Sequence, residues 1–239
     1  MEKNPKYLLE EVGKLEITLT DTQISQLVQY YDLLVEWNSF MNLTGITDYE
    51  EVVIKHFVDS LSLVKGFDLS KEYSLIDVGT GAGFPGLPLK IVFPNLKITL
   101  LDSLNKRINF LNEVISVLGL TDIETIHGRA EDFAKKKEYR ESFDFCVSRA
   151  VANLSVLSEY CLPFVKLDGY FVSYKSEKLA EELAASAKAI SVLGGSVEKQ
   201  VDFYLQDSMY RNLVCIKKVN STPKAYPRKA GTAVKSPIC

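Results

Sequence analysis

Apolar residues recur along the chain with two different spacings, and the change between them falls near residue 65. Up to that point the spacing is helical, because a capping box at residues 20–23 is followed by apolar residues at intervals of three and four. A second helical stretch covers residues 50–65. We therefore expect residues 1–65 to form a helical extension packed on a core domain.

From residue 66 to residue 239 short apolar runs alternate with amphipathic segments. The runs predict strands and the segments predict helices, in an order typical of a parallel sheet covered on both faces. The expected strands cover residues 74–78, 97–101, 122–126, 143–148 and 168–174. The expected helices cover residues 85–92, 104–118, 130–136, 153–161 and 177–193. The fold class is therefore α/β.

Two further strand-like runs follow Gly194-Gly195, which ends the last long helix. They cover residues 196–204 and 212–218, and the short connection between them predicts an antiparallel pair. A mostly parallel sheet finished by an antiparallel strand resembles the sheet of the common methyltransferase fold.

A glycine-rich turn follows the first expected strand. Residues 74–86 read Ser-Leu-Ile-Asp-Val-Gly-Thr-Gly-Ala-Gly-Phe-Pro-Gly. Glycine lets the backbone approach a ligand closely or adopt a positive φ. We therefore expect a nucleotide-type ligand at this strand, turn and helix start, with contacts from Gly79, Gly81 and Gly83.

The same turn matches the dinucleotide fingerprint, with Asp102 near the distance of a ribose-binding acid. Two details favour another ligand. Asp77 would face a positive group, such as the methionine ammonium of S-adenosylmethionine, and would repel a pyrophosphate. Phe84 leaves less room for a pyrophosphate at the helix start. S-adenosylmethionine is the favoured cofactor, and a dinucleotide oxidoreductase is the alternative.

Chemistry-bearing residues also follow the next three expected strands. Asp102 is placed to accept both ribose hydroxyls, with helix capping as the alternative. Ala130 and Glu131 stand where an adenine ring would rest, although Glu131 also suits a helix start. Arg149 is placed to meet a cofactor carboxylate or an RNA phosphate, and a structural pairing with Asp77 or Glu131 is the alternative.

Charge is distributed unevenly, although the net charge is only −3. Residues 1–207 hold 21 basic and 31 acidic residues, whereas residues 208–239 hold seven basic and no acidic residues. A basic tail, from about residue 220, on an acidic body suits contact with a polyanion such as RNA, and a solvated terminus is the alternative. The candidate RNA contacts are Lys224, Arg228, Lys229 and Lys235.

Other chemistries find little support. The four cysteines have no CxxC spacing, which argues against a zinc site or a disulfide framework and predicts reduced thiols in a cytoplasmic protein. The first residues lack the apolar core of a signal peptide. The apolar window 75–93 contains Asp77, Lys90 and several glycines and prolines, so it predicts a buried sheet unit rather than a membrane span. We expect no metal, no membrane partner and a monomer.

Three further motifs complete a resemblance that covers essentially the whole chain. They are Trp37-Asn38-x-x-Met41-Asn42-Leu43-Thr44, His56-x-x-Asp59-Ser60 and Tyr226-Pro227-Arg228-Lys229-x-Gly231-Thr232. Together with the glycine turn they resemble the bacterial small-subunit ribosomal RNA guanine-N7 methyltransferases, formerly called glucose-inhibited division protein B. Two positions depart from the family pattern, Ala233 in place of proline and Ser39 in place of an often basic residue.

The resemblance implies a class I S-adenosylmethionine-dependent methyltransferase (Rossmann-like) fold. It implies transfer of a methyl group to N7 of one guanine in 16S rRNA, as naked RNA or within the small-subunit ribosomal particle. It also implies cofactor contacts at positions matching Gly79, Phe84, Ala130, Glu131 and Arg149.

This reaction agrees with the lack of an evident catalytic pair. Guanine N7 has a free lone pair and no proton, so it can attack the methyl group in line without a general base. The positioning candidates are Arg149 and His56, which shares a helical face with Asp59 as a structural pair or a substrate contact. A small-molecule methyltransferase and a non-catalytic nucleotide-binding regulator are the alternatives.

Overall fold

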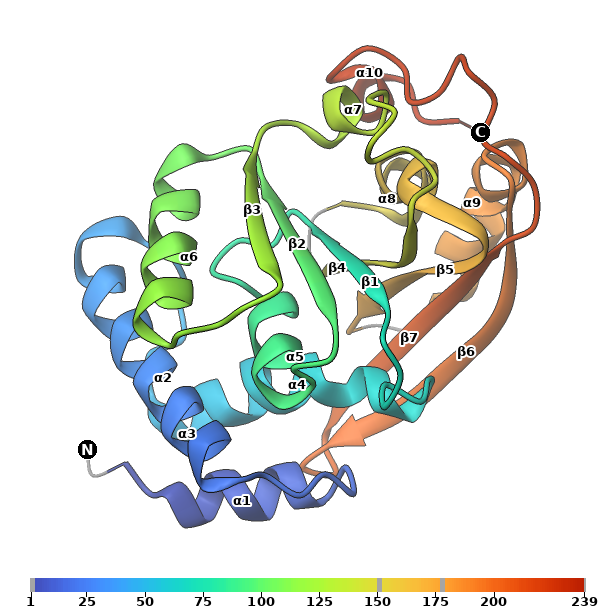
Figure 1. Ribbon diagram of the computed structural model, residues 1–239. Coiled ribbons are helices and arrows are strands. Elements are labelled where there is room, and N and C mark those ends of the chain that lie inside the picture. Colours follow the sequence, from blue (N-terminus) through green and yellow to red (C-terminus); the bar gives the residue numbers. More distant parts are fainter. Residues whose placement is uncertain (1–2, 150–151, 177–178, 239) are drawn as a thin grey trace.

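A seven-stranded sheet forms the centre of the computed structural model, which describes residues 3–149, 152–176 and 179–238 (Figure 1). The strand order is β3-β2-β1-β4-β5-β7-β6. The first five strands are parallel, and β7 runs antiparallel to both β5 and β6. The expected sheet is therefore confirmed. The strands are β1 (Ser74–Val78), β2 (Lys97–Asp102), β3 (Ile123–His127), β4 (Phe143–Arg149), β5 (Val165–Lys175), β6 (Gly195–Leu205) and β7 (Met209–Lys218).

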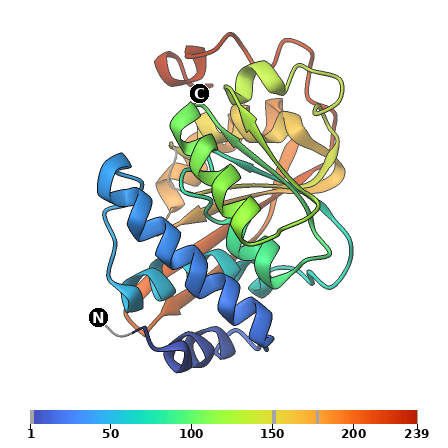
Figure 2. The same cartoon turned by 60° about the vertical axis from the view of Figure 1, so that its left-hand side comes forward.

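Helices cover both faces of the sheet and form two hydrophobic cores. The first core contains the N-terminal helices, whereas the second lies under the helices that follow β3, β4 and β5 (Figures 1 and 2). The helices of the first core are α1 (Pro5–Gly13), α2 (Asp21–Met41), α3 (Tyr49–Val52), a π-helix (Val53–Val58), α4 (Asp59–Leu61), a 3₁₀ helix (Ser62–Lys65), α5 (Gly86–Val92) and α6 (Asn105–Val117). The others are α7 (Ala130–Phe133), α8 (Leu154–Cys161), a 3₁₀ helix (Leu162–Phe164), α9 (Ala180–Val192) and α10 (Thr232–Lys235).

Most expected elements are present with small differences at their ends. The helix expected over 130–136 ends at Phe133. The helix expected over 177–193 is α9, which starts at Ala180, and residues 177 and 178 lie outside the described residues. Strand β5 is longer than expected because it begins at Val165. Neither α10 nor the π-helix is evident from residue spacing.

Helix α2 of the N-terminal helical segment contacts the glycine turn. Its capping box forms as expected, since Thr20 N donates to Gln23 Oε1 at 2.9 Å and Gln23 N donates to Thr20 Oγ1 at 3.3 Å. Further along the helix, the buried Tyr30 hydroxyl donates to the carbonyl oxygen of Ala82, and its ring lies 5.4 Å from that of Phe84. This hydrogen bond and this ring contact therefore pack the N-terminal helical segment against the turn. A division of domains at residue 65 stays a prediction.

The glycine turn packs tightly at Gly83. Its φ is +99°, and a Cβ there would lie 2.3 Å from Leu87 Cδ1 and 2.9 Å from Tyr30 Oη. Gly119, at the end of α6, also has a positive φ of +61°, but no atom lies within 4 Å of its Cβ position. Substitutions at these two glycines therefore distinguish the free-energy cost of a positive φ from the cost of a steric clash.

We expect Gly83→Ala to lower the free energy of unfolding more than Gly119→Ala. The left-handed backbone alone costs about 1 to 2 kcal/mol, and the collision with Leu87 adds about 1 to 3 kcal/mol at Gly83 only. Urea unfolding of the two variants measures the difference. Equal losses would show that the turn relaxes freely around an added methyl group.

Candidate active site

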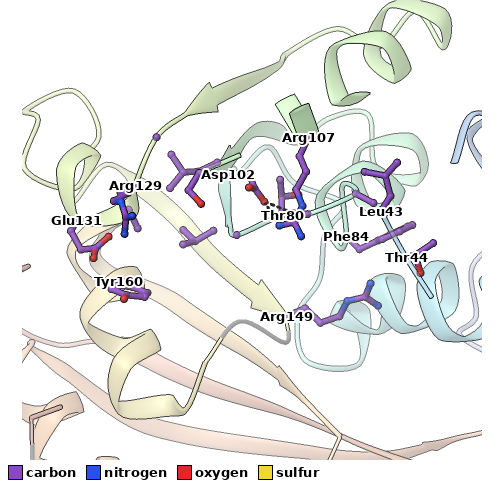
Figure 3. A pocket seen from close by; sticks show the side chains of 18 of the residues that line it. Leu43, Thr44, Thr80, Phe84, Asp102, Arg107, Arg129, Glu131, Arg149 and Tyr160 are labelled. Atoms are coloured by element: carbon purple, nitrogen blue, oxygen red, sulfur yellow. Dashed lines mark hydrogen bonds and ion pairs between the residues drawn. The ribbon is translucent and has the colours of Figure 1, made fainter. Parts of the chain in front are cut away.

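A cavity of about 500 Å³ opens where the carboxyl ends of β1, β2, β3 and β4 meet (Figure 3). The strand order reverses between β1 and β4, and such a switch point is where open α/β sheets bind ligands. The cavity brings together eight of the residues expected at the site. They are His56, Gly79, Gly81, Phe84, Asp102, Ala130, Glu131 and Arg149.

Asp102 ties the glycine turn to the end of β2. Its Oδ2 accepts hydrogen bonds from Gly81 N at 2.9 Å and from Arg107 Nη1 at 3.1 Å, and its Oδ1 accepts from Leu104 N at 2.9 Å. The residue lines the cavity although it is only 2% exposed. Asp102 therefore lines the cavity and also bonds to the start of α6, and its contact with a ligand stays a prediction.

Asp77 lies beneath the turn, and neither it nor Gly83 lines the cavity. Its Oδ2 accepts from Thr80 Oγ1 at 2.7 Å and from Gly86 N at 2.9 Å, whereas Oδ1 is buried without a hydrogen bond among the described residues. Burial raises the pKa of this carboxyl to about 6, against the effect of both bonds. The geometry assigns Asp77 to the shape of the turn, and its direct contact with a ligand stays a prediction.

Arg149, which lines the cavity, is held by a buried carboxylate. Its Nη1 donates to Asp59 Oδ2 at 2.7 Å and to the Lys55 carbonyl at 3.0 Å. Arg211 Nε, from β7, donates to the second oxygen of Asp59 at 2.8 Å. The partner of Arg149 is therefore Asp59, not Asp77 or Glu131 as the structural alternative supposes. The two guanidinium groups thus share one carboxylate, so Asp59, Arg149 and Arg211 together carry a net positive charge.

His56 stacks on Phe84 with ring centroids 4.5 Å apart. Its Nδ1 lies 3.0 Å from the Lys55 carbonyl oxygen, which can only accept, and 3.4 Å from Arg149 Nη2, which can only donate. We assign the proton to Nδ1 because the contact with the carbonyl is the shorter. Its Nε2 then accepts from Thr44 Oγ1 at 2.9 Å. Burial, followed by the charge of Arg149, lowers the pKa of His56 to about 4. The imidazole is therefore neutral at pH 7, and both of its nitrogens are engaged.

Ala130 and Glu131 line the far end of the cavity, where Figure 3 shows Glu131 beside Tyr160 and Arg129. Both belong to α7 and are buried. Glu131 Oε1 accepts a hydrogen bond from Gly231 N at 2.9 Å. The wall of the cavity is therefore joined to a segment one hundred residues further along the chain.

The basic C-terminal part of the chain is largely neutralised by acidic partners. Of its seven basic residues, four form ion pairs: Arg211 with Asp59, Lys217 with Asp168, Lys218 with Glu141, and Arg228 with Glu159. The other three, Lys224, Lys229 and Lys235, are exposed and have no acidic partner in the part of the chain that the structure describes. These three lysines remain the candidates for contact with a polyanion.

The cavity also contains residues that the sequence analysis did not select. Arg107 could have been found, because it lies within the first turn of a helix that follows a strand-end acid. Leu43 and Thr44 belong to one of the three motifs of the resemblance, which assigns them no role. Tyr160 carried no local signal, because only the packing of α8 against the sheet brings it to the cavity.

Across residues 3–149, 152–176 and 179–238, no helix is both long and apolar enough to cross a bilayer. The same residues include no group of three or more His, Cys, Asp or Glu side chains arranged to hold a metal ion.

Comparisons with known proteins agree with this geometry. A model of the GidB family, described as rRNA small subunit methyltransferase G, matches residues 23–214. Proteins named ribosomal RNA small subunit methyltransferase G from Lachnoclostridium phytofermentans and Desulforamulus reducens are 55% and 53% identical to this chain. The alignments cover 96% of both chains in the first case and 97% of both in the second.

Solved structures show the same fold at low sequence identity. An S-adenosylmethionine-dependent methyltransferase from Aquifex aeolicus has a TM-score of 0.55 at 22% identity, over 74% of this chain and 97% of that one. A 16S rRNA (adenine(1408)-N(1))-methyltransferase from Catenulisporales acidiphilia has a TM-score of 0.54 at 13% identity, over 64% and 88%. The class I methyltransferase fold is therefore confirmed.

We expect Asp77→Asn to change how stability depends on pH. The folded-state pKa of about 6 lies above the ordinary value of 3.8, so the folded state binds the proton more tightly. This contribution is full below pH 3.8 and is lost as pH rises through 6. Relative to the wild type, the variant should gain about 2 to 3 kcal/mol between pH 4 and pH 7. Urea unfolding at both pH values tests this, and parallel profiles would contradict it.

Proposed function

Because the chain belongs to the rRNA small subunit methyltransferase G family, we propose that it transfers a methyl group from S-adenosylmethionine to N7 of a guanine in 16S rRNA. The main support is the gathering of eight expected residues around one cavity at the switch point of the sheet. Membership of the family establishes that the chain is an rRNA methyltransferase. The identity of the cofactor, the choice of guanine as the target base and the choice of N7 as the methylated atom are the proposal.

The residues around the cavity fit this cofactor. Gly81 has a φ of +64°, and no atom lies within 4 Å of its Cβ position, so the turn presents bare backbone to the cavity. Asp102, at the end of β2, would hold the ribose hydroxyls, and Ala130 would border the adenine. When bound, S-adenosylmethionine supplies an electrophilic methyl group on a sulfonium centre. The chain's own part is to bind and orient.

The charged residues suit an acceptor that needs no deprotonation. Guanine N7 carries a lone pair and no proton, so the main requirement is alignment with the methyl group. His56 is neutral with Nε2 occupied by Thr44, so it is a positioning residue for Phe84 rather than a base. Methylation leaves a positive charge on the purine. Asp59 offsets part of the neighbouring charge of Arg149 and so lowers the repulsion of that product.

We expect purified protein to transfer labelled methyl groups to guanine N7 in 16S rRNA, supplied naked or as small subunits. Gly81→Leu should lower cofactor affinity by about tenfold or more, about 1.4 kcal/mol, because its side chain would enter the cavity. Gly119→Leu is the matched control, with a similar φ of +61° and similar open space outside the cavity. Calorimetric titration and mapping of the label measure both effects.

Other outcomes would favour the alternatives. Transfer only to small molecules in a metabolite extract would support a small-molecule methyltransferase. Cofactor binding without transfer to any acceptor would support a regulator. Equal loss of affinity in both glycine variants would show that backbone strain, not occupation of the cavity, causes the effect.

We further propose that Lys224, Lys229 and Lys235 contact phosphates of the RNA. Replacing all three with glutamine should reduce the slope of log affinity against log salt by about 0.7 for each contact with single-stranded RNA. Replacing Lys71 and Lys97, near the amino ends of β1 and β2 and so away from the cavity, is the control. Filter binding at several salt concentrations gives the slopes, and an unchanged slope in the triple variant would contradict the proposal.

A further inference from the structure

The segment after β7 is fastened to the wall of the cavity rather than projecting from the protein. We call residues 222–238 the strap. Figure 1 shows the strap passing over α7 and α8, at the end of the molecule where the carboxyl ends of the parallel strands lie. Ala233, in its short helix α10, is buried, and Ser155 Oγ of α8 donates to the carbonyl of Ile238 at 2.9 Å.

The strongest attachment joins Arg228 to Glu159 of α8. Glu159 is 1% exposed, and its Oε1 accepts from Arg228 N at 2.8 Å and from Arg228 Nε at 2.9 Å. Its Oε2 accepts from Arg228 Nη2 at 2.6 Å. A buried carboxylate without a partner is costly, so Glu159 strongly favours the seated strap. The guanidinium that the sequence suggests for RNA contact is therefore committed within the protein.

Arg140 fastens the start of the strap to the chain beyond α7. Its Nη2 donates to the Thr222 carbonyl at 2.7 Å, and its Nη1 donates to the Tyr226 carbonyl at 2.9 Å and to the Ala134 carbonyl at 3.2 Å. The residue therefore bridges the strap and the end of α7. Because α7 is a single short turn, these bonds limit how far it can move.

Glu131 links the strap to the wall of the cavity. Its Oε1 accepts from Gly231 N at 2.9 Å, and the side chain is 4% exposed while lining the cavity. Gly231 has a φ of +81°, a conformation that glycine adopts without strain. A backbone N–H in a fixed position selects one orientation of the carboxylate, and loss of this donor would leave a buried charge undersolvated.

We propose that the strap is a positioning element of the cofactor site. The Arg228–Glu159 pair seats the strap, and the Gly231 N–H then fixes the Glu131 carboxylate at the end of the cavity assigned to adenine. This inference rests on the proposed function, because it takes the ligand to be S-adenosylmethionine. Arg228 acts on the cofactor through Glu131, whereas the exposed lysines of the strap act on RNA.

The experiment compares Arg228→Met with Lys217→Met, which removes a surface ion pair from β7 instead. We expect Arg228→Met to weaken S-adenosylmethionine binding by about tenfold, and Lys217→Met to leave it unchanged. Calorimetric titration at a temperature where urea unfolding shows both variants to be folded gives the dissociation constants. If Arg228→Met does not fold, Arg228→Lys keeps the charge opposite Glu159 and should give a smaller loss.

A second comparison separates positioning from a general loss of stability. In a Glu131→Ala background, Arg228→Met should cause no further loss of cofactor affinity, because the group through which it acts is gone. Additive losses in the double variant, or unchanged affinity in Arg228→Met and Arg228→Lys, would overturn the inference. If the wild type itself binds no S-adenosylmethionine, the proposed function fails instead.

Discussion

The site depends on how two carboxylates hold the backbone of the glycine turn. Asp77, beneath the turn, accepts from Gly86 N, and Asp102, on the next strand, accepts from Gly81 N. Each oxygen therefore satisfies a backbone donor that a tight turn leaves without a partner. The turn keeps its shape from these bonds and from the Tyr30 hydroxyl behind it, so bare backbone can form one side of the cavity.

Three other buried carboxylates also hold segments of the chain in place. Asp59 binds Arg149 and Arg211, Glu159 binds Arg228, and Glu131 accepts from a backbone N–H of the strap. In each case the partner comes from a segment distant in sequence. Because an unpaired buried charge is costly, each pair favours one position of the segment that carries the partner. The N-terminal helices, β7 and the strap are located in this way around the same cavity.

The sequence predicted the sheet and eight of the residues that line the cavity because these features have local signals. Alternation of runs locates the strands, and residues at the carboxyl ends of parallel strands, such as Asp102 and Arg149, must converge on one side of the sheet. Partners across the fold have no such signal. The pairing of Arg228 with Glu159 and the arrival of Tyr160 depend on how α8 packs. A count of basic residues suggested a tail that contacts a polyanion, with a solvated terminus as the alternative, and gave no sign that Arg228 fastens this segment to α8.

The strand order has a further consequence for behaviour at high concentration. It leaves β3 and β6 as the edges of the sheet, where unpaired backbone groups could recruit strands from other molecules. Strand β3 is only five residues long, and β6 presents exposed Glu198, Lys199 and Asp202. Short length and charge both oppose strand addition. The sheet that builds the cavity thus carries a feature at each edge that opposes aggregation, short length at β3 and charge at β6.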